Sequence, residues 1–430
     1  MKKIYCCLIL LFCVLSIAAQ CPVSPSAEGP VSYYGELKVK SGTPNIDGVK
    51  ESREKNIEQV QIRGVSFFWS DWSLSFYNAN AVERLAKDWK AEVVRAAFGP
   101  YRNSTVAIKT VVDAAIANDI YVIIDWHSHS AHNESETSKA ITFFTEMAET
   151  YGSCDHVIFE LYNEPLNIPW ADIKSYAEKV IPVIRQHSDN LILVGTPIYS
   201  QKVEDVIGYA IDDINVAYVL HFYAASHPLN DWRNNIVNAR ANNLPLFVTE
   251  YGTTHSSGGC SPEVSDCGTD VNGKPISYYN THNATRSDEW HAFMDGRKIS
   301  SVAWSVFDKY EGSAFFGTVP NGTFDQTIEE NWSDTTKMTT SGKYIFKKLN
   351  EYYKCVPYNP DYDEESCKPA VSPVLPFVKD LQFNNAIAEV YTLQGKKMGN
   401  LHELNLKNGI YIVRLRQNGA VQTKIMRIAK

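Results

Sequence analysis

The 430-residue sequence lacks features that would place it in several common protein classes. It has no basic excess, because its net charge at pH 7 is -8, and this argues against a nucleic-acid-binding protein. No cysteine pair has the C-x-x-C spacing that is typical of zinc sites. No glycine-rich phosphate turn follows an early strand pattern, which disfavours a doubly wound nucleotide-binding sheet. Internal repeats and coiled-coil heptads are also missing.

The sequence also lacks a hydrophobic run long enough to span a membrane. A Met-Lys-Lys start precedes the apolar run over residues 4–17, and two alanines follow it. This pattern predicts a secretory signal peptide over residues 1–20, since the run is too short for a membrane-spanning helix. Cys21 raises the alternative of a lipid anchor, but Gln20 stands where such a site needs a small residue. We therefore expect a secreted or cell-surface protein.

Cysteine is scarce after the predicted signal peptide. Of the nine cysteines, three lie within that segment and leave with it. The others are Cys21, Cys154, Cys260, Cys267, Cys355 and Cys367. An even number in an exported chain suggests disulfides. The spacing favours the local pairs Cys260–Cys267 and Cys355–Cys367, which would leave Cys21 and Cys154 as a third pair.

Strand and helix patterns alternate regularly through most of the sequence. Apolar, β-branched runs predict strands over residues 60–67, 91–98, 120–127, 156–162, 190–195, 215–223, 246–251 and 299–307. Helical patterns follow them over residues 79–89, 105–118, 134–151, 171–187, 203–209, 231–242, 286–297 and 341–353. About eight such strand–helix units predict an α/β fold, a (β/α)8 TIM barrel, over residues 21–354.

Two further stretches stand out from this alternation. Residues 34–39 hint at a small hairpin that closes the bottom of the barrel. Residues 252–286 form a long polar segment, and a loop of that length within a barrel is usually functional or tied by a disulfide.

Two of the predicted strands deliver a glutamate to their carboxyl ends, where TIM barrels carry their chemistry. The strand over 156–162 runs into Asn163-Glu164-Pro165, and the strand over 246–251 contains Glu250. Either glutamate alone is more simply explained as a salt-bridge partner. Together they are what cleavage of a glycosidic bond needs, because one protonates the leaving oxygen while the other attacks or stabilises the sugar cation.

A metal site is the alternative chemistry at these strand ends. His127-Ser128-His129 has the H-x-H pattern of zinc ligands, and His221 at another strand end could supply a third. The paired glutamates explain more of the strand-end residues without a metal. We therefore expect neither a metal nor a cofactor.

In their order along the chain, these motifs resemble glycoside hydrolase family 5, and most closely its endoglucanase (cellulase) branch. The likeness covers residues 31–353 and rests on Arg95 in Val-Val-Arg-Ala-Ala-Phe, Asp125-Trp126-His127, Tyr162-Asn163-Glu164-Pro165, His221-Phe222-Tyr223, Thr249-Glu250-Tyr251-Gly252 and Trp304-Ser305-Val306-Phe307-Asp308-Lys309. It implies a retaining endo-β-1,4-glucanase that binds a β-glucan polysaccharide or oligosaccharide. A mannanase, a xyloglucanase, a mixed-linkage β-glucanase and a non-catalytic carbohydrate-binding surface protein stay open as alternatives.

The resemblance implies roles for the two glutamates and their neighbours. Glu164 would be the acid/base and Glu250 the nucleophile. Asn163 would form a hydrogen bond with the sugar 2-hydroxyl. Arg95 and Tyr223 would hold Glu250 charged and aimed at the sugar. The negative charge of Glu250 is expected to raise the pKa of Glu164, so that Glu164 keeps its proton.

Other residues are expected to bind or support the substrate. His127 and His221 would bind hydroxyl groups or tune the carboxylates, and Trp304 would stack on a sugar at the cleavage subsite. Lys309 would contact a more distant hydroxyl group. Where cellulases of this branch often have a histidine after the first strand, this sequence has aromatic residues, and Trp69 among them would serve as a sugar platform.

The end of the sequence differs in character from the barrel. Residues 355–374 are rich in Pro, Asp and Glu and predict a linker. Residues 375–430 predict a small β module, because alternating patterns over 410–416 and 421–428 flank Asn418-Gly419, a strong hairpin signal.

This β module resembles the C-terminal sorting domain of the Bacteroidetes-type outer-membrane secretion route. The stretches Val390-Tyr391-Thr392-Leu393-Gln394-Gly395-Lys396 and Gly409-Ile410-Tyr411-Ile412-Val413-Arg414 carry the likeness. The resemblance implies export machinery as a partner. We expect a monomer otherwise.

Overall fold

The structure, a computed structural model, divides into two compact units, Met1–Pro360 and Asp361–Lys430. It describes residues 20–38, 49–50, 60–101, 105–213, 215–255, 282–308, 312–316, 331–363, 367, 387–391, 396–400, 409–417 and 420–428. Lys309 and most of the 252–286 segment, with Cys260 and Cys267, lie outside these residues.

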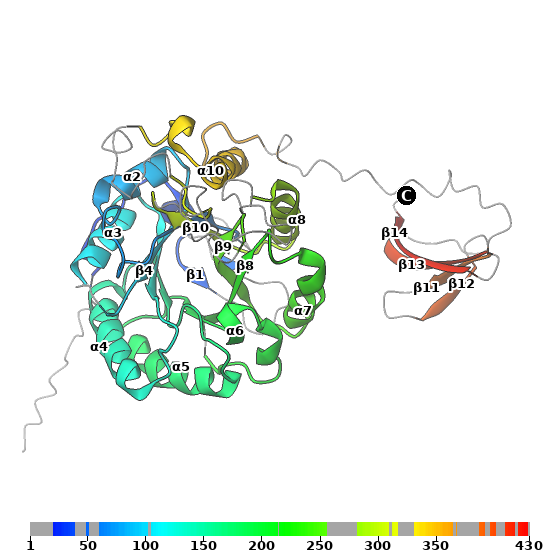
Figure 1. Cartoon of the computed structure of the whole chain (residues 1–430), viewed down its shortest axis with the longest axis horizontal. Helices are drawn as coiled ribbons and strands as arrows, with labels where there is room; N and C mark the ends of the chain where they lie inside the picture. The colour runs from blue at the N-terminus through cyan, green and yellow to red at the C-terminus, as the bar shows by residue number, and fades with distance from the viewer. Residues whose placement is uncertain are drawn as a thin grey trace, which may run out of the picture. The chain divides into compact units, whose positions relative to one another are not determined.

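The first unit is a closed barrel of eight parallel strands inside a ring of helices (Figure 1). The strands are β3 (Arg63–Phe67), β4 (Val93–Phe98), β5 (Tyr121–Trp126), β6 (Val157–Glu160), β7 (Ile192–Val194), β8 (Val216–Tyr223), β9 (Leu246–Gly252) and β10 (Ser301–Val306). Each pairs with the strand before it in sequence, and β10 closes the barrel against β3. The predicted (β/α)8 barrel is therefore confirmed.

The helices follow the strands as the alternation predicts. They are α2 (Ala79–Lys87), α3 (Val106–Ala117), α4 (Glu134–Tyr151), α5 (Trp170–Arg185), α6 (Pro197–Ser200), α7 (Leu229–Ala241), α8 (Ala284–Asp295) and α10 (Thr340–Tyr353), with 3₁₀ turns η1 (Val203–Val206) and η3 (Thr335–Lys337). The helix predicted over 203–209 is wrong in extent, because only η1 forms there. Gly208 follows with φ 81°, a left-handed conformation that ends a helical turn.

The interior of the barrel changes from apolar to polar along the strands. Alternate residues of a strand face the same side, so each strand sends every second side chain inward. Near the amino ends the inner cluster is apolar and includes Val93, Ile123, Ile158 and Val219. Two residues later on the same strands come buried polar side chains: Arg95, Asp125, Glu160 and His221. The buried polar side chains therefore lie next to a packed apolar layer inside the barrel.

The chain before β3 closes the amino end of the barrel. Helix α1 (Pro30–Tyr34) and strand β1 (Leu37–Lys38) contribute Val31, Tyr34 and Leu37 to the inner apolar cluster. Strand β1 pairs antiparallel with β2 (Val49–Lys50). The segment expected to form a hairpin over 34–39 thus supplies one strand of a two-stranded sheet, whose partner lies farther along the chain.

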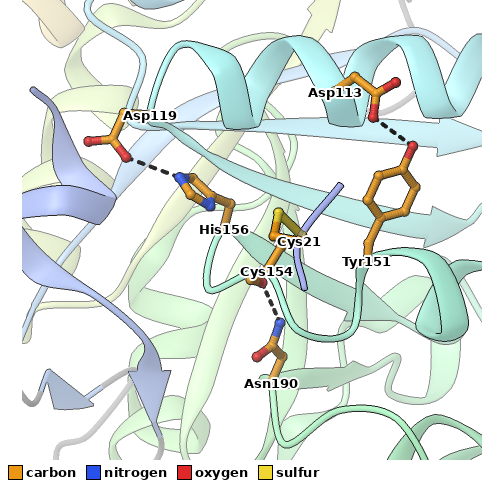
Figure 2. The surroundings of a disulfide bond; sticks show 7 residues. All are labelled: Cys21, Asp113, Asp119, Tyr151, Cys154, His156 and Asn190. Carbon is orange, nitrogen blue, oxygen red and sulfur yellow. Dashed lines mark hydrogen bonds and ion pairs between the residues drawn. A yellow bond between two sulfur atoms is a disulfide. The ribbon is translucent and has the colours of Figure 1, made fainter. Parts of the chain in front are cut away.

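A disulfide joins Cys21 to Cys154, across 133 residues of sequence (Figure 2). Cys154 lies just before β6, and its carbonyl oxygen accepts a hydrogen bond of 2.8 Å from the Asn190 amide. Nearby, His156 Nε2 lies 3.0 Å from Asp119 Oδ1, and the other oxygen of Asp119 accepts the backbone N–H of Ser32. The N-terminal segment is thus attached to the barrel covalently and by hydrogen bonds.

Cys355 and Cys367 are also disulfide-bonded, which agrees with the expected local pair. The first unit extends beyond α10, since Val356 is buried and the Tyr358 hydroxyl donates to Glu92. It therefore includes the beginning of the segment that the composition marks as a linker.

The second unit is a four-stranded antiparallel sheet in the order β12-β11-β13-β14. Its strands are β11 (Ile387–Tyr391), β12 (Lys397–Asn400), β13 (Gly409–Gln417) and β14 (Ala420–Ile428). Gln417 pairs with Ala420, so a two-residue connection joins β13 to β14 and the predicted hairpin is confirmed. Across the described residues of both units, no helix is long and apolar enough to cross a membrane.

Candidate active site

The two glutamates meet at the carboxyl end of the barrel. Glu164 follows β6, and Glu250 lies in β9. The β8–β9 ladder changes register after Val219, and beyond this irregularity His221 pairs with Glu250. Such irregularities re-aim side chains, and here Thr249 and Glu250 are both buried and both bond to groups inside the barrel. One carboxylate oxygen of each glutamate and one ring nitrogen of His221 all lie within 4.8 Å of one another.

Arg95 is the centre of a fully buried network of charged side chains. Its Nε and Nη2 donate to the two oxygens of Glu160 at 2.7 and 3.1 Å, a bidentate pair. Its Nη1 donates to Glu250 Oε2 at 3.1 Å. Its Nη2 also donates to Asn163 Oδ1 at 2.6 Å and lies 2.9 Å from Asp125. Burial lowers the pKa of Arg95, but the surrounding carboxylates outweigh burial and raise it.

Glu250 is held at both of its carboxylate oxygens. The Tyr223 hydroxyl donates to Oε1 at 2.7 Å while Arg95 donates to Oε2, so both predicted supports are in contact. Burial and the charge of Glu164 raise the pKa of Glu250 above its ordinary value, whereas His221, Arg95 and the Tyr223 hydrogen bond act to lower it. These contacts fix the direction of the carboxylate.

Glu164 has different surroundings. Its Oε1 lies 3.0 Å from His221 Nδ1, and its Oε2 lies 3.9 Å from His129 Nδ1. Burial raises the pKa of Glu164 to about 7, against the opposing charges of His129 and Arg95. The expectation that the charge of Glu250 causes this rise is wrong, because burial is the main cause and Glu160 is the carboxylate that adds to it.

His127 lies between aromatic rings rather than beside the two glutamates. Its Nδ1 lies 2.7 Å from Asp125 Oδ2, and burial holds the pKa of His127 well below its ordinary value. The Trp304 ring stacks on the His127 ring with their centroids 5.3 Å apart, and the Trp69 ring packs edge-on against the His127 ring with their centroids 4.8 Å apart. Trp304 is only 6% exposed, and its peptide bond to Ser305 is cis. Burial also raises the pKa of Asp125, although Arg95 opposes this.

The metal alternative fits the geometry poorly. Among the described residues, the group of three possible ligands that lie close enough together is Glu164, His221 and Glu250. It contains neither His127 nor His129. Their Nδ1 atoms already face Asp125 and the Glu164 carbonyl oxygen, so the H-x-H pair does not form a ligand set with His221.

Two polar residues of the site were missed by sequence reasoning. Glu160 binds Arg95, and Thr249 bonds both Glu160 and His221. His129, which the sequence offered only as a possible zinc ligand, contacts the Glu164 segment. A signal existed for Glu160, since a glutamate at an inward position of an apolar strand needs a buried partner. Thr249 gave no signal, because threonine is common in strands.

Three exposed aromatic residues that follow barrel strands were also missed. Trp72 follows β3, Tyr101 follows β4 and Tyr199 lies in α6 after β7, and they are 65%, 55% and 46% exposed. The backbone N–H of Tyr199 donates to the carbonyl oxygen of Pro165, next to Glu164. Exposed rings at these positions are suited to stacking on sugars.

Comparisons with known proteins agree with this geometry. Residues 53–310 match the family described as cellulase (glycosyl hydrolase family 5). Endoglucanase Z of Dickeya dadantii is 40% identical over 66% of this chain and 61% of its own length. Cellulase CelDZ1 of a Thermoanaerobacterium species is 32% identical over 76% of this chain and 84% of its own length.

Solved structures show the same relationship. A structure from Cytophaga hutchinsonii is 36% identical with a TM-score of 0.62, and the match covers 75% of this chain and 96% of that one. The catalytic domain of a Thermobifida fusca endoglucanase is 29% identical with a TM-score of 0.62, covering 75% of this chain and 99% of that one. Another structure of that catalytic domain, at 28% identity, a TM-score of 0.61 and the same coverage, holds cellotetraose.

Proposed function

This chain belongs to the cellulase family, glycosyl hydrolase family 5, and from that premise we propose that it is a retaining endo-β-1,4-glucanase acting on cellulose-type β-glucans. The observation that carries the proposal is the pair Glu164 and Glu250, whose carboxylate oxygens approach within 4.8 Å. Retaining glycosidases place their two carboxyl groups about 5–5.5 Å apart, whereas inverting enzymes need about 6.5–9.5 Å for a water molecule. The names of the relatives support the choice of substrate.

The reaction proceeds by double displacement. A carboxylate oxygen of Glu250 attacks the anomeric carbon and the glycosidic C–O bond breaks, while Glu164 gives its proton to the leaving oxygen. In the second step the Glu164 carboxylate takes a proton from water, and the water oxygen displaces Glu250 from the sugar. A pKa of about 7 suits Glu164 to both steps, since it must first lose a proton and then regain one.

The neighbouring residues prepare these two groups. Arg95 and Tyr223 keep Glu250 aimed through hydrogen bonds to its two oxygens. The amide oxygen of Asn163 accepts from Arg95, which leaves the amide N–H groups of Asn163 for the sugar 2-hydroxyl. His221 faces Glu164.

The indole of Trp304 stacks on the sugar at the cleavage subsite, and His127 binds a hydroxyl group beside it. Trp69 and the exposed Trp72 form a platform for the next sugars. Lys309, which lies outside the described residues, contacts a more distant hydroxyl group.

An assay of the purified full chain tests the proposal. The substrates are carboxymethyl-cellulose, lichenan, xyloglucan and galactomannan, and the variants are Glu164→Gln and Glu250→Gln. Glu178→Gln is the matched control, because Glu178 is exposed on α5, where it pairs with Lys174. Release of reducing ends with a rapid fall in viscosity of carboxymethyl-cellulose, lost in the two site variants and kept in the control, supports an endoglucanase.

Other outcomes are equally informative. A first product with the inverted anomeric configuration, observed by NMR before mutarotation, would overturn the retaining mechanism. Activity on galactomannan or xyloglucan alone would keep the mechanism and replace the substrate. Binding to these polysaccharides without hydrolysis would replace the enzyme with a carbohydrate-binding surface protein.

We further propose that the protein is secreted or held at the cell surface as a monomer, and that the 375–430 module addresses it to outer-membrane export machinery. The four-stranded sheet of this module is a separate compact unit, as an independent signal requires. Deletion of residues 375–430, which keeps Cys367, should leave activity in the cell fraction and remove it from the medium. Equal secretion of the shortened chain would contradict the sorting role.

A further inference from the structure

A chain of hydrogen bonds connects the buried Glu160 to the acid/base residue Glu164. The Thr249 hydroxyl lies 2.7 Å from Glu160 Oε1. The same hydroxyl oxygen lies 2.9 Å from Nε2 of His221. At the other side of the imidazole ring, Nδ1 lies 3.0 Å from Glu164 Oε1. Thr249, Glu160 and His221 are all at most 1% exposed, so bulk solvent does not reach these side chains.

The positions of the protons in this chain follow from the donors and acceptors. Glu160 receives two N–H groups of Arg95, which marks it as an ionised carboxylate that only accepts. The single proton of the Thr249 hydroxyl therefore points to Glu160. The Thr249 oxygen must then accept from His221, so Nε2 of the imidazole carries a hydrogen.

His221 has only one ring hydrogen under working conditions. Burial lowers the pKa of His221 to about 4, so the ring is neutral near neutral pH. Because Nε2 holds the hydrogen, Nδ1 presents a lone pair to Glu164. The short contact between Nδ1 and Glu164 Oε1 is then a hydrogen bond only if Glu164 is the donor.

We propose that Thr249 and Glu160 are positioning residues that fix the tautomer of His221, and that His221 thereby acts as the hydrogen-bond acceptor of the protonated Glu164. This inference rests on the acid/base role proposed for Glu164. The proposed hydrogen bond explains how His221 favours the protonated form of Glu164 before the first step of the reaction. After Glu164 has given up its proton, the same lone pair faces the carboxylate and makes it a stronger base toward water.

Other charged groups near this chain do not replace its effect. Glu250, Arg95, Glu160 and His129 influence His221, and His129, Arg95 and Glu160 influence Glu164. The cationic groups among them favour the ionised form of Glu164. The neutral tautomer of His221 is the neighbour that bonds specifically to its protonated form.

Two substitutions of Thr249 in the full chain test the proposal. Thr249→Val keeps the shape of the side chain and removes its hydroxyl, whereas Thr249→Ser keeps the hydroxyl. In Thr249→Val the His221 hydrogen can move to Nδ1 and bond to the Glu164 carboxylate, which stabilises the ionised form. We expect the alkaline limb of kcat/KM on a cello-oligosaccharide to move to lower pH, with about fivefold lower kcat/KM at pH 7 if the pKa of Glu164 falls by about one unit from its value near 7. Thr249→Ser should restore the wild-type profile.

The leaving group separates this role from a merely structural one. Dinitrophenyl β-cellobioside needs little help from a general acid to form the glycosyl-enzyme, so Thr249→Val should keep nearly the wild-type kcat/KM on it, because kcat/KM reports only the first step. Equal losses on both substrates, or an unchanged alkaline limb, would overturn the proposal.

A direct readout does not depend on turnover. ¹⁵N NMR of histidine-labelled protein distinguishes the protonated from the unprotonated ring nitrogen, and His221 is assigned by its loss in His221→Gln. We expect a hydrogen on Nε2 in the wild type and in Thr249→Ser, and a redistribution toward Nδ1 in Thr249→Val. A wild-type ring protonated on Nδ1 overturns the inference, even if the enzyme cleaves cellulose. If the wild type cleaves no glycoside, the proposed function fails, while the tautomer still decides this inference.

Discussion

Removal of the Cys21–Cys154 disulfide should lower the free energy of unfolding strongly while leaving catalysis intact. The bond closes a loop across 133 residues that includes β3, β4 and β5 (Figure 2). For a loop of that size, the chain-entropy relation gives a stabilisation of about 5 kcal/mol at 25 °C, because the cross-link restricts the unfolded chain. The folded state keeps other attachments of the same segment, such as the hydrogen bond from Ser32 to Asp119.

The variant is the full chain with both Cys21→Ala and Cys154→Ala, so that no free thiol is left at the site. All nine tryptophans lie in the first unit, so tryptophan fluorescence during guanidinium unfolding reports on the barrel alone. We expect a loss of about 5 kcal/mol. The kcat at 25 °C should be unchanged, since Cys154 precedes β6 whereas Glu164 follows it.

A control separates the cross-link from the packing of Cys154, which is 1% exposed. Cys21→Ala together with Cys154→Val keeps an apolar side chain at the buried position but no bond. An equal loss of stability in both double variants would assign it to the cross-link. A loss below about 1 kcal/mol in either would refute the chain-entropy reasoning.

Three further predictions concern charged groups. His129→Asn keeps a donor for the Glu164 carbonyl oxygen but removes the imidazole whose charge lowers the pKa of Glu164, so the alkaline limb of kcat/KM should move above pH 7. An unmoved limb would contradict this. Arg95→Met should cost about 3–5 kcal/mol in unfolding free energy and abolish activity, because it leaves buried carboxylates without their partner; a loss under 1 kcal/mol would be inconsistent with that network. Within the part of the chain that the structure describes, neither ring nitrogen of the buried His291 has a hydrogen-bond partner, and burial holds its pKa well below the ordinary value. The unfolded state therefore binds an extra proton, so the stability that is present above about pH 6.5 is lost as the pH falls. In His291→Phe, the free energy of unfolding measured in denaturant titrations should fall less between about pH 7 and about pH 5.

The features that the sequence predicts well are those written in local patterns. Seven of the eight barrel strands lie within their predicted runs, and β9 extends one residue beyond its run, since buried parallel strands are short apolar segments between amphipathic helices. The hairpin at Asn418-Gly419 was predicted for the same reason, because its turn residues and flanking alternation are neighbours in sequence. Glu164 and Glu250 could be predicted to lie together, because both come at the carboxyl ends of predicted barrel strands.

The features that the sequence leaves open depend on distant contacts. The register change between β8 and β9 is not visible in either strand alone, yet it accompanies the arrangement in which Thr249 and Glu250 both reach the site. The sequence predicts the bond between Cys21 and Cys154 only indirectly, because these two cysteines are left over once the two local pairs are assigned. The cause of the raised pKa of Glu164 was also misassigned, because the depth of burial is set by the whole barrel and not by the neighbouring charge.

The different roles proposed for Glu164 and Glu250 follow from the small number of positive charges near them in the barrel. Arg95 contacts Asp125, Glu160 and Glu250, and no contact joins it to Glu164. Ionising all four carboxyl groups would leave an excess of negative charge in a buried site, which is costly, so protons must stay in the cluster. Arg95 acts on Glu164 only through its charge and not through a hydrogen bond, and in the proposed tautomer of His221 a lone pair of a neutral imidazole faces Glu164. In the proposed mechanism Glu164 is therefore the carboxyl group that keeps its proton near neutral pH, while Glu250, held by Arg95, is the one that attacks.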